Sequence, residues 1–202
     1  MVARFFARLA SAAAGAAVVS VLLASCTVDD ALTTSFGEDS AASVSTEGRI
    51  QEIAPEDRGD PVEFEGVDEH GRHISSDDVE GVMVVNFWYA GCGPCRAEAP
   101  LLEDVWSEYA ADGVRFIGVN IYDQADTALA FAETYGITYP SVIDADSGQV
   151  RQAFAGQTPL NATPSTLVLD SENRVAVRIV GQLPDASILS TLVADTQAQS
   201  GT

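Results

Sequence analysis

Two cysteines separated by two residues are the side chains of this sequence best suited to covalent chemistry. Cys92 and Cys95 stand in the segment Cys-Gly-Pro-Cys, and the third cysteine of the chain, Cys26, lies far away near the N-terminus. A disulfide that closes so short a loop adds little to stability through chain entropy. Thiolates, in contrast, attack disulfides and exchange them through a mixed disulfide. The pair therefore predicts thiol–disulfide exchange rather than a structural cross-link.

The residues on either side of the pair predict a strand that turns into a helix at Cys92. Residues 82–89 form a β-branched and aromatic run that is typical of a buried strand. From Cys95 to Tyr109, apolar residues recur at helical spacing, with Pro94 in the first turn. Backbone N–H groups and the helix dipole stabilise an anion at the helix N-terminus. We therefore expect Cys92 to be the nucleophile and the more buried Cys95 to be the resolving thiol.

Glu98 follows Cys95 by three residues, on the helix face that Leu102 and Val105 also occupy. A carboxyl group buried on this face loses its hydration, and this loss favours the neutral form. Glu98 is therefore a candidate acceptor for the proton of Cys95. The alternative is an ordinary acidic residue in the first turn that suits the helix dipole.

The segment around the cysteines resembles the TlpA/ResA-like branch of the thioredoxin superfamily. The resemblance rests on Val-Asn-Phe-Trp at residues 85–88 and on Cys-Gly-Pro-Cys-Arg-Ala-Glu-Ala-Pro at residues 92–100. It implies a thioredoxin-like fold, disulfide reductase activity outside the cytoplasm and a functional role for Glu98. Thioredoxin itself has a buried aspartate where this chain has Asn86, so the role of base falls to Glu98. Gly91 departs from the branch, which often has a bulky aromatic residue or threonine there.

The same resemblance places a cis-proline loop at Thr163 and Pro164, directly before an apolar strand. Only about 5–6% of X–Pro bonds are cis in folded proteins, so this expectation depends on the family. Pro164 would keep metal ions away from the thiols, and the Thr163 backbone would pair with an extended substrate segment. We also expect Trp88, Gly93 and Pro94 to bind substrate. The alternative for Trp88 is packing in the core or at the rim of the site.

The order of the elements predicts an α/β fold. Strand-like runs cover residues 82–89, 114–121, 142–143 and 174–180 and the run after Pro164, and helical patterns cover residues 95–109, 125–135, 150–154 and the residues from 185 onward. Strands that are joined first by helices and then by a hairpin give a mixed central sheet with helices on both faces. This thioredoxin-like domain is expected to cover residues 60–198, followed by a short tail, residues 199–202.

The first 25 residues predict a lipoprotein signal peptide. Arg4 and Arg8 give a basic start, residues 9–24 are apolar or small, and Leu-Ala-Ser-Cys at residues 23–26 looks like a bacterial lipobox. Cleavage before Cys26 would leave this cysteine as a lipidated N-terminus, and two or three acyl chains hold a domain durably at a membrane. The alternatives are a cleaved secretory signal or a transmembrane span, although the run is shorter than the roughly 20 residues that a span needs.

Residues 26–59 connect this anchor to the domain. They are rich in Ser, Thr, Ala, Asp and Glu and show no helical or strand period, so we expect a flexible tether. A short helix near residues 50–53 is the alternative for its last part. The whole molecule is thus expected on the extracytoplasmic face of the cell membrane, attached through the lipid on Cys26.

Charge narrows the expected partners. The chain has a formal net charge of -20 and no lysine, which argues against nucleic acid as a partner. We expect protein thiols and disulfides as substrates and no cofactor besides the redox-active disulfide of Cys92 and Cys95. The resemblance adds a membrane thiol protein as electron donor.

Three functions remain open from the sequence. The first is a reductase of exported proteins, such as apocytochrome c before haem attachment, and the second is an exported oxidant that supports disulfide formation. The third is a metal-binding lipoprotein, because His70 and His73 could join Cys92 and Cys95 as four ligands. The histidines lie in residues 68–73, a segment that is typical of an exposed hairpin turn, and such a position argues against the metal site.

Overall fold

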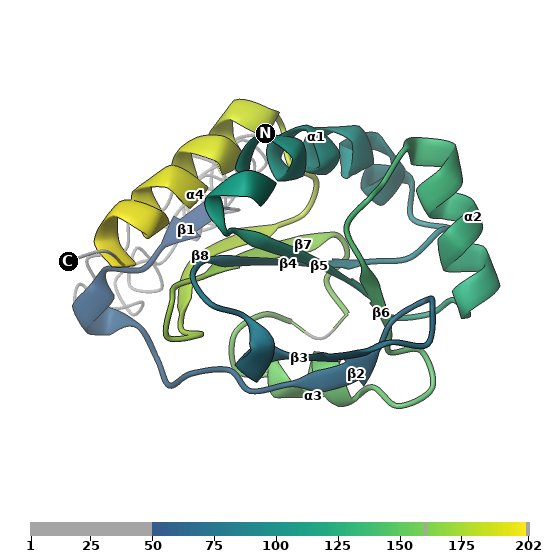
Figure 1. The fold of residues 1–202 in the computed structure, drawn as a ribbon, viewed down its shortest axis with the longest axis horizontal. Coiled ribbons are helices and arrows are strands. Elements are labelled where there is room, and N and C mark those ends of the chain that lie inside the picture. Colours follow the sequence, from purple (N-terminus) through teal and green to yellow (C-terminus); the bar gives the residue numbers. More distant parts are fainter. Residues whose placement is uncertain (1–49, 160, 201–202) are drawn as a thin grey trace, which may run out of the picture. The chain divides into compact units, whose positions relative to one another are not determined.

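The computed structural model describes residues 50–159 and 161–200, which contain a six-stranded sheet in the order β1-β8-β7-β4-β5-β6 (Figure 1). The strands of this sheet are β1 (Ile50–Glu52), β4 (Met83–Trp88), β5 (Arg115–Asn120), β6 (Ser141–Ile143), β7 (Ser165–Leu169) and β8 (Val175–Val180). A two-stranded sheet consists of β2 (Glu65–Val67) and β3 (His73–Ser75). The helices are α1 (Gly93–Tyr109), α2 (Ala125–Tyr135), α3 (Gln149–Ala153) and α4 (Ala186–Ser200), with short 3-10 turns at Pro55–Asp57, Ser76–Asp78 and Ala110–Asp112.

The central sheet is mixed. Strands β4, β5 and β6 run parallel, whereas β7 is antiparallel to β4, and β8 is antiparallel to both β7 and β1. Parallel neighbours need a crossover, and α1 and α2 supply the two crossovers on the same side of the sheet. The predicted α/β fold with a mixed sheet is confirmed.

Alternation along the strands gives the sheet two apolar faces. On one face, Val84 packs with Leu102 of α1 and Leu189 of α4. On the other face, Met83 and its alternate neighbours pack with residues of α3 and of the segment around β2. Figure 1 shows α1 and α4 on one side of the sheet and α3 with the β2–β3 hairpin on the other. Helices therefore cover both faces, as the sequence predicts.

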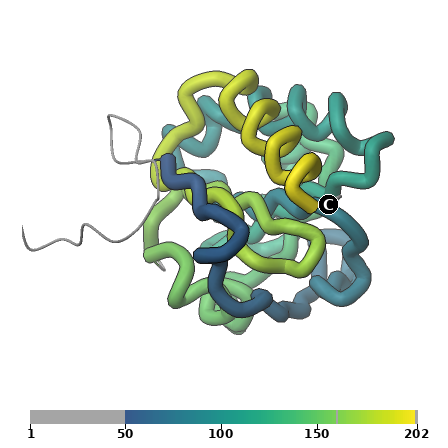
Figure 2. The backbone as a smooth tube through the Cα atoms, turned by 90° about the vertical axis from the view of Figure 1, so that its left-hand side faces the viewer, coloured from purple at the N-terminus to yellow at the C-terminus, as the bar shows by residue number. Residues whose placement is uncertain are grey.

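The first described strand, β1, begins at residue 50, ten residues before the predicted domain boundary at residue 60. Ile50 lies opposite Ile179 in β8, and the Ile53 N–H donates to the carbonyl of Ala176 at 2.8 Å. Figure 2 shows this first described segment running along the strand. A three-residue strand is too short to give a period, so the sequence suggested a tether or a short helix here. At the other end, α4 continues to Ser200, two residues into the predicted tail.

The predicted signal peptide and Cys26 lie outside the described residues. Within residues 50–159 and 161–200, the structure contains no helix with the length and apolar character that crossing a bilayer requires.

Two hairpin turns use the same carboxylate arrangement. Asp68 accepts hydrogen bonds from the backbone of His70 and Arg72 and from the Arg72 side chain, and Asp170 does the same with Glu172 and Arg174. Burial alone would raise the pKa of each aspartate, but these hydrogen bonds outweigh burial and lower it. Two of the ten arginines of the chain, Arg72 and Arg174, thus stabilise these turns.

Candidate redox site

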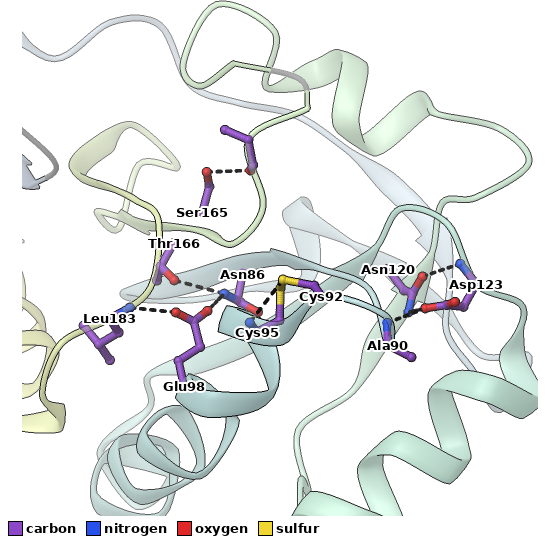
Figure 3. Close-up of a disulfide and its surroundings, with 11 residues drawn as sticks. Asn86, Ala90, Cys92, Cys95, Glu98, Asn120, Asp123, Ser165, Thr166 and Leu183 are labelled. Atoms are coloured by element: carbon purple, nitrogen blue, oxygen red, sulfur yellow. Dashed lines mark hydrogen bonds between the residues drawn. A yellow bond between two sulfur atoms is a disulfide. The ribbon is translucent and has the colours of Figure 1, made fainter.

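The redox turn joins the end of β4 to the start of α1. Cys92 and Cys95 form a disulfide there (Figure 3). Cys92 is the N-cap residue of α1, and its Sγ accepts a hydrogen bond from the Cys95 N–H at 3.1 Å. The sulfur thus occupies the position at which a helix N-terminus stabilises an anion. The structure places Cys92 at the strand-to-helix turn that the sequence predicts.

Both cysteines are covered by protein. Cys92 is 4% exposed and Cys95 is 2% exposed, so the two sulfurs differ less in burial than we expected. Gly93 and Pro94, between them, are exposed and offer the surface nearest to the disulfide in the chain. The turn itself is therefore the exposed surface that directly borders the disulfide along the chain.

Glu98 is 1% exposed and faces inward from α1, one turn after Cys95. Its Oε1 accepts a hydrogen bond from Asn86 Nδ2 at 2.9 Å, and its Oε2 accepts one from the Leu183 N–H at 2.7 Å. Asn86 donates its second amide hydrogen to Thr166 Oγ1 at 3.0 Å. Figure 3 shows the chain of groups that runs from Leu183 through Glu98 and Asn86 to Thr166. The Glu98 carboxylate is thus held by Asn86 of β4 and by the loop before α4, and Thr166 of β7 in turn holds Asn86.

Burial raises the pKa of Glu98 to about 7, although the hydrogen bonds from Leu183 and Asn86 act in the opposite direction. A carboxyl group with this pKa both accepts and releases a proton near neutral pH, as a general acid–base group must. Among the described residues, no hydrogen bond joins Glu98 to either sulfur. A cavity of about 10 Å³, lined by Cys95, Asn86 and Tyr139 among others, has room for about one water molecule.

The Thr163–Pro164 peptide bond is cis. Strand β7 begins at the next residue, and Ser165 lies opposite Phe87 in β4. This register puts Pro164 level with Trp88, at the end of β4 from which the redox turn starts. Pro164 is buried and Thr163 is half-buried. The loop is closed by a hydrogen bond from Ser165 Oγ to the carbonyl of Ala162 at 2.7 Å.

The Trp88 side chain packs inside the protein. It is 6% exposed, its ring lies 4.3 Å from that of Phe131 between centroids, and its Nε1 donates to Ser141 Oγ at 3.2 Å. The structure thus favours the core-packing alternative over our prediction of a substrate-binding side chain. The reason is α2, which brings Phe131 over the end of β4.

Asn120 and Asp123 were not predicted as site residues. Asp123 Oδ2 accepts hydrogen bonds from the Ala90 N–H at 2.6 Å and from Asn120 Nδ2 at 3.0 Å. These contacts tie the loop after β5 to the turn before Cys92, as Figure 3 shows. The carboxyl ends of neighbouring parallel strands meet at one edge of a sheet, so Asn120 at the end of β5 and Asp123 in the following loop could have been placed near the redox turn.

The two histidines lie on the β2–β3 hairpin. The side chains of His70 and His73 are 54% and 59% exposed, and each has a glutamate of the hairpin within 4 Å. In the described part of the chain, no group of three or more His, Cys, Asp or Glu residues is arranged to hold a metal ion. The histidines and cysteines therefore do not form the four-ligand site that we considered.

Comparisons with known proteins agree with this geometry. The model of the AhpC/TSA family matches residues 59–178. The thiol-disulfide oxidoreductase ResA of Bacillus subtilis (strain 168) is 28% identical over 122 residues, which cover 60% of this chain and 65% of ResA. The ResA of Geobacillus thermodenitrificans is 34% identical over 122 residues, covering 60% and 67%. This chain thus spans just under two thirds of the length of the first of these relatives.

Solved structures show the same similarity. A DsbF homologue from Corynebacterium diphtheriae is 27% identical with a TM-score of 0.65, and the alignment covers 73% of this chain and 92% of that one. A secreted thiol-disulfide isomerase from Corynebacterium glutamicum is 25% identical with a TM-score of 0.68, covering 74% and 92%. The predicted resemblance to ResA-like thiol–disulfide oxidoreductases is therefore confirmed.

Proposed function

We propose that this chain, which belongs to the AhpC/TSA family, is a thiol–disulfide oxidoreductase that reduces disulfides of proteins outside the cytoplasm. The observation that carries the proposal is the disulfide of Cys92 and Cys95 at the N-terminus of α1. The names of the ResA relatives support thiol–disulfide chemistry, and the Gly-Pro dipeptide between the cysteines, which reducing thioredoxins also carry, supports the reducing direction.

In the proposed reaction, the Cys92 thiolate of the reduced enzyme attacks one sulfur of a substrate disulfide. A bond forms between Cys92 Sγ and that sulfur, and the second substrate sulfur leaves as a thiolate that takes up a proton. Cys95 then loses its proton and attacks Cys92 Sγ, which releases the first substrate sulfur as a thiolate. The substrate gains two electrons, and the enzyme is left with its Cys92–Cys95 disulfide.

Glu98 is proposed to accept the proton of Cys95 in the second step. Its pKa of about 7 suits this role, and its position one turn after Cys95 brings it to the buried side of the pair. Pro164 and Thr163 are proposed to flank the disulfide and to receive the backbone of the substrate, while Gly93 and Pro94 form the surface that the substrate meets first.

The proposed setting is the outer face of the cell membrane, with a lipid on Cys26 as anchor. Suitable substrates there are exported proteins with oxidised cysteines, including apocytochrome c before haem attachment. A reductase outside the cytoplasm must be reduced again, so we propose a membrane protein with a reactive dithiol as the electron donor. No cofactor besides the Cys92–Cys95 disulfide is needed for this two-electron exchange.

The reduction potential of the Cys92–Cys95 pair tests the proposal. Titration in dithiol buffers with thiol labelling should give a value near the thioredoxin potential of about -270 mV. A value near about -120 mV would instead assign the chain to oxidation of its substrates. If the two cysteines formed no disulfide at any potential, the redox function would be wrong.

Trapping provides a second test. Replacing the resolving thiol, Cys95→Ser, should let mixed disulfides between Cys92 and substrates accumulate, because the second attack is lost. Cys92→Ser is the matched control and should trap nothing. Absence of trapped partners with Cys95→Ser in membranes would contradict the exchange mechanism.

A further inference from the structure

A half-buried tyrosine, Tyr89, and an exposed one, Tyr122, form an aromatic pair beside the redox turn. Tyr89 directly follows β4, and its carbonyl accepts a hydrogen bond from the Cys92 N–H at 3.1 Å. Tyr122 lies in the loop between β5 and α2 and is 56% exposed. The two rings meet edge to face with centroids 5.1 Å apart. The Tyr89 ring also lies against Gly91, where an added Cβ would be 3.2 Å from a ring carbon.

Polar contacts hold this pair in place next to the disulfide. The Asn120 Oδ1 accepts hydrogen bonds from the backbone N–H groups of Tyr122 and Asp123, at 3.1 and 2.7 Å. Asp123 in turn binds the Ala90 N–H, between Tyr89 and Cys92. The loop that carries Tyr122 is thus fastened to the turn that carries Tyr89. Figure 3 shows Ala90, Asn120 and Asp123, which join this loop to the turn, on the side of the disulfide opposite to Glu98.

Exposed carboxylates follow Tyr122 closely along the chain. Residues 116–150 contain no lysine or arginine. Asp126 is exposed in the first turn of α2, and Asp146 is exposed and accepts a hydrogen bond from Gln124, next to the loop. Tyrosine faces attract cations, and the aliphatic stems of lysine and arginine pack on aromatic rings. Neighbouring carboxylates add a Coulomb attraction for the same side chains.

We propose that the Tyr89–Tyr122 pair is a docking surface that selects substrate polypeptides with a lysine or arginine close to the reacting disulfide. The inference rests on the proposed function, because it assumes that Cys92 reacts with protein disulfides. Tyrosine is among the residues that most often carry the binding energy of protein interfaces. A basic side chain stacks on the exposed ring, whereas an acidic side chain is repelled by the surrounding carboxylates.

Three peptides test this selection with the full chain in its reduced form. Each contains the same small cystine loop, and a lysine, a leucine or a glutamate stands two residues from one cysteine. The measured quantity is kcat/KM for reduction of the peptide disulfide. We expect lysine to exceed leucine and leucine to exceed glutamate. Tyr122→Ala should lower the ratio of the lysine to the leucine peptide by about threefold to tenfold, the range of a partly exposed cation–π contact.

Two further variants separate the ring from its surroundings. Tyr122→Phe keeps the ring and should keep the ratio, whereas Asp126→Asn should mainly lower the ratio of the lysine to the glutamate peptide. The reduction potential and the melting temperature of each variant establish that the redox turn and the fold are intact. Because the readout is a ratio, it does not depend on the overall rate of a variant.

The outcomes distinguish the two proposals. Equal kcat/KM values for the three peptides, together with efficient reduction, would overturn the docking inference and leave the oxidoreductase function standing. An unchanged ratio in Tyr122→Ala would also overturn it. If the wild type reduced neither the peptides nor a small neutral disulfide, the oxidoreductase function itself would be wrong, and the docking inference with it.

Discussion

Glu98 combines two opposing influences on one carboxyl group. Its near-complete burial favours the neutral form, and the donors Asn86 and Leu183 favour the charged form. Burial is the larger influence, and the pKa rises from the usual value of 4.5 to about 7. A residue with this pKa changes charge near neutral pH, so two properties of the protein should depend on it.

The first property is stability. The unfolded chain releases the Glu98 proton near pH 4.5, whereas the folded protein keeps it up to about pH 7. The folded state binds more protons between these values, so its free energy of unfolding falls as the pH rises, by about 3 kcal/mol in total. We expect Glu98→Gln to remove this dependence. As the pH rises from 5 to 8, the free energy of unfolding should therefore fall in the wild type but not in the variant. Urea titrations at several pH values measure this change in the difference between the two proteins. A constant difference would argue against the raised pKa.

The second property is the pH dependence of exchange. Asn86 donates a hydrogen bond to the charged form of Glu98, so Asn86→Ala should raise the pKa of Glu98 further. The inflection in the rate of disulfide exchange should move upward by about one pH unit. Thr166→Val is the matched control, because it removes the other partner of Asn86 and leaves the bond to Glu98 in place. Equal inflections in Asn86→Ala and the wild type would show that Glu98 is not the titrating group.

The sequence predicts an individual helix or strand correctly where its apolar run or period extends over many residues. Strand β4, the helix that follows the cysteines and α2 carry runs or periods of six or more residues, and they stand where the sequence placed them. Strand β1 has three residues and was missed. The role of Trp88 depends on Phe131 and Ser141, which are distant in sequence. No local pattern contains that information, because the contact exists only after β5, α2 and β6 have assembled beside β4.

The contact between β5 and β6 makes a prediction at this scale. A Cβ added to Gly118 would collide with Ser141 Oγ and lie 2.8 Å from Trp88 Nε1. These two atoms are hydrogen-bonded to each other and have little room to move. We expect Gly118→Ala to lower the free energy of unfolding by about 1–3 kcal/mol, the usual cost of overpacking. Gly156→Ala is the control, since a Cβ there meets no atom within 4 Å. Equal denaturation midpoints for the two variants would contradict the close approach of β5 and β6.

At the scale of the whole molecule, the expected location depends on residues 1–26, which lie outside the described residues. The domain from residue 50 onward carries the disulfide, the buried glutamate and the acidic surface. Residues 1–26 carry the predicted lipoprotein signal, which would determine where these groups work. The expected location and the expected chemistry therefore depend on different cysteines, and the two can be separated by experiment.

The variant Cys26→Ser tests the location without changing the redox pair. If Cys26 is the lipidation site, the wild type should incorporate an alkyne-labelled fatty acid in growing cells, and Cys26→Ser should lose the label completely, because the thiol that receives the lipid is gone. Cys92→Ser is the matched control, and it should keep the label and lose disulfide exchange. Cys26→Ser, extracted in detergent, should retain the reduction potential of the wild type, since the Cys92–Cys95 pair is untouched. A wild type that is cleaved and released without label would instead support the cleaved secretory signal. In that case, the docking surface would meet its substrates in solution rather than at the membrane.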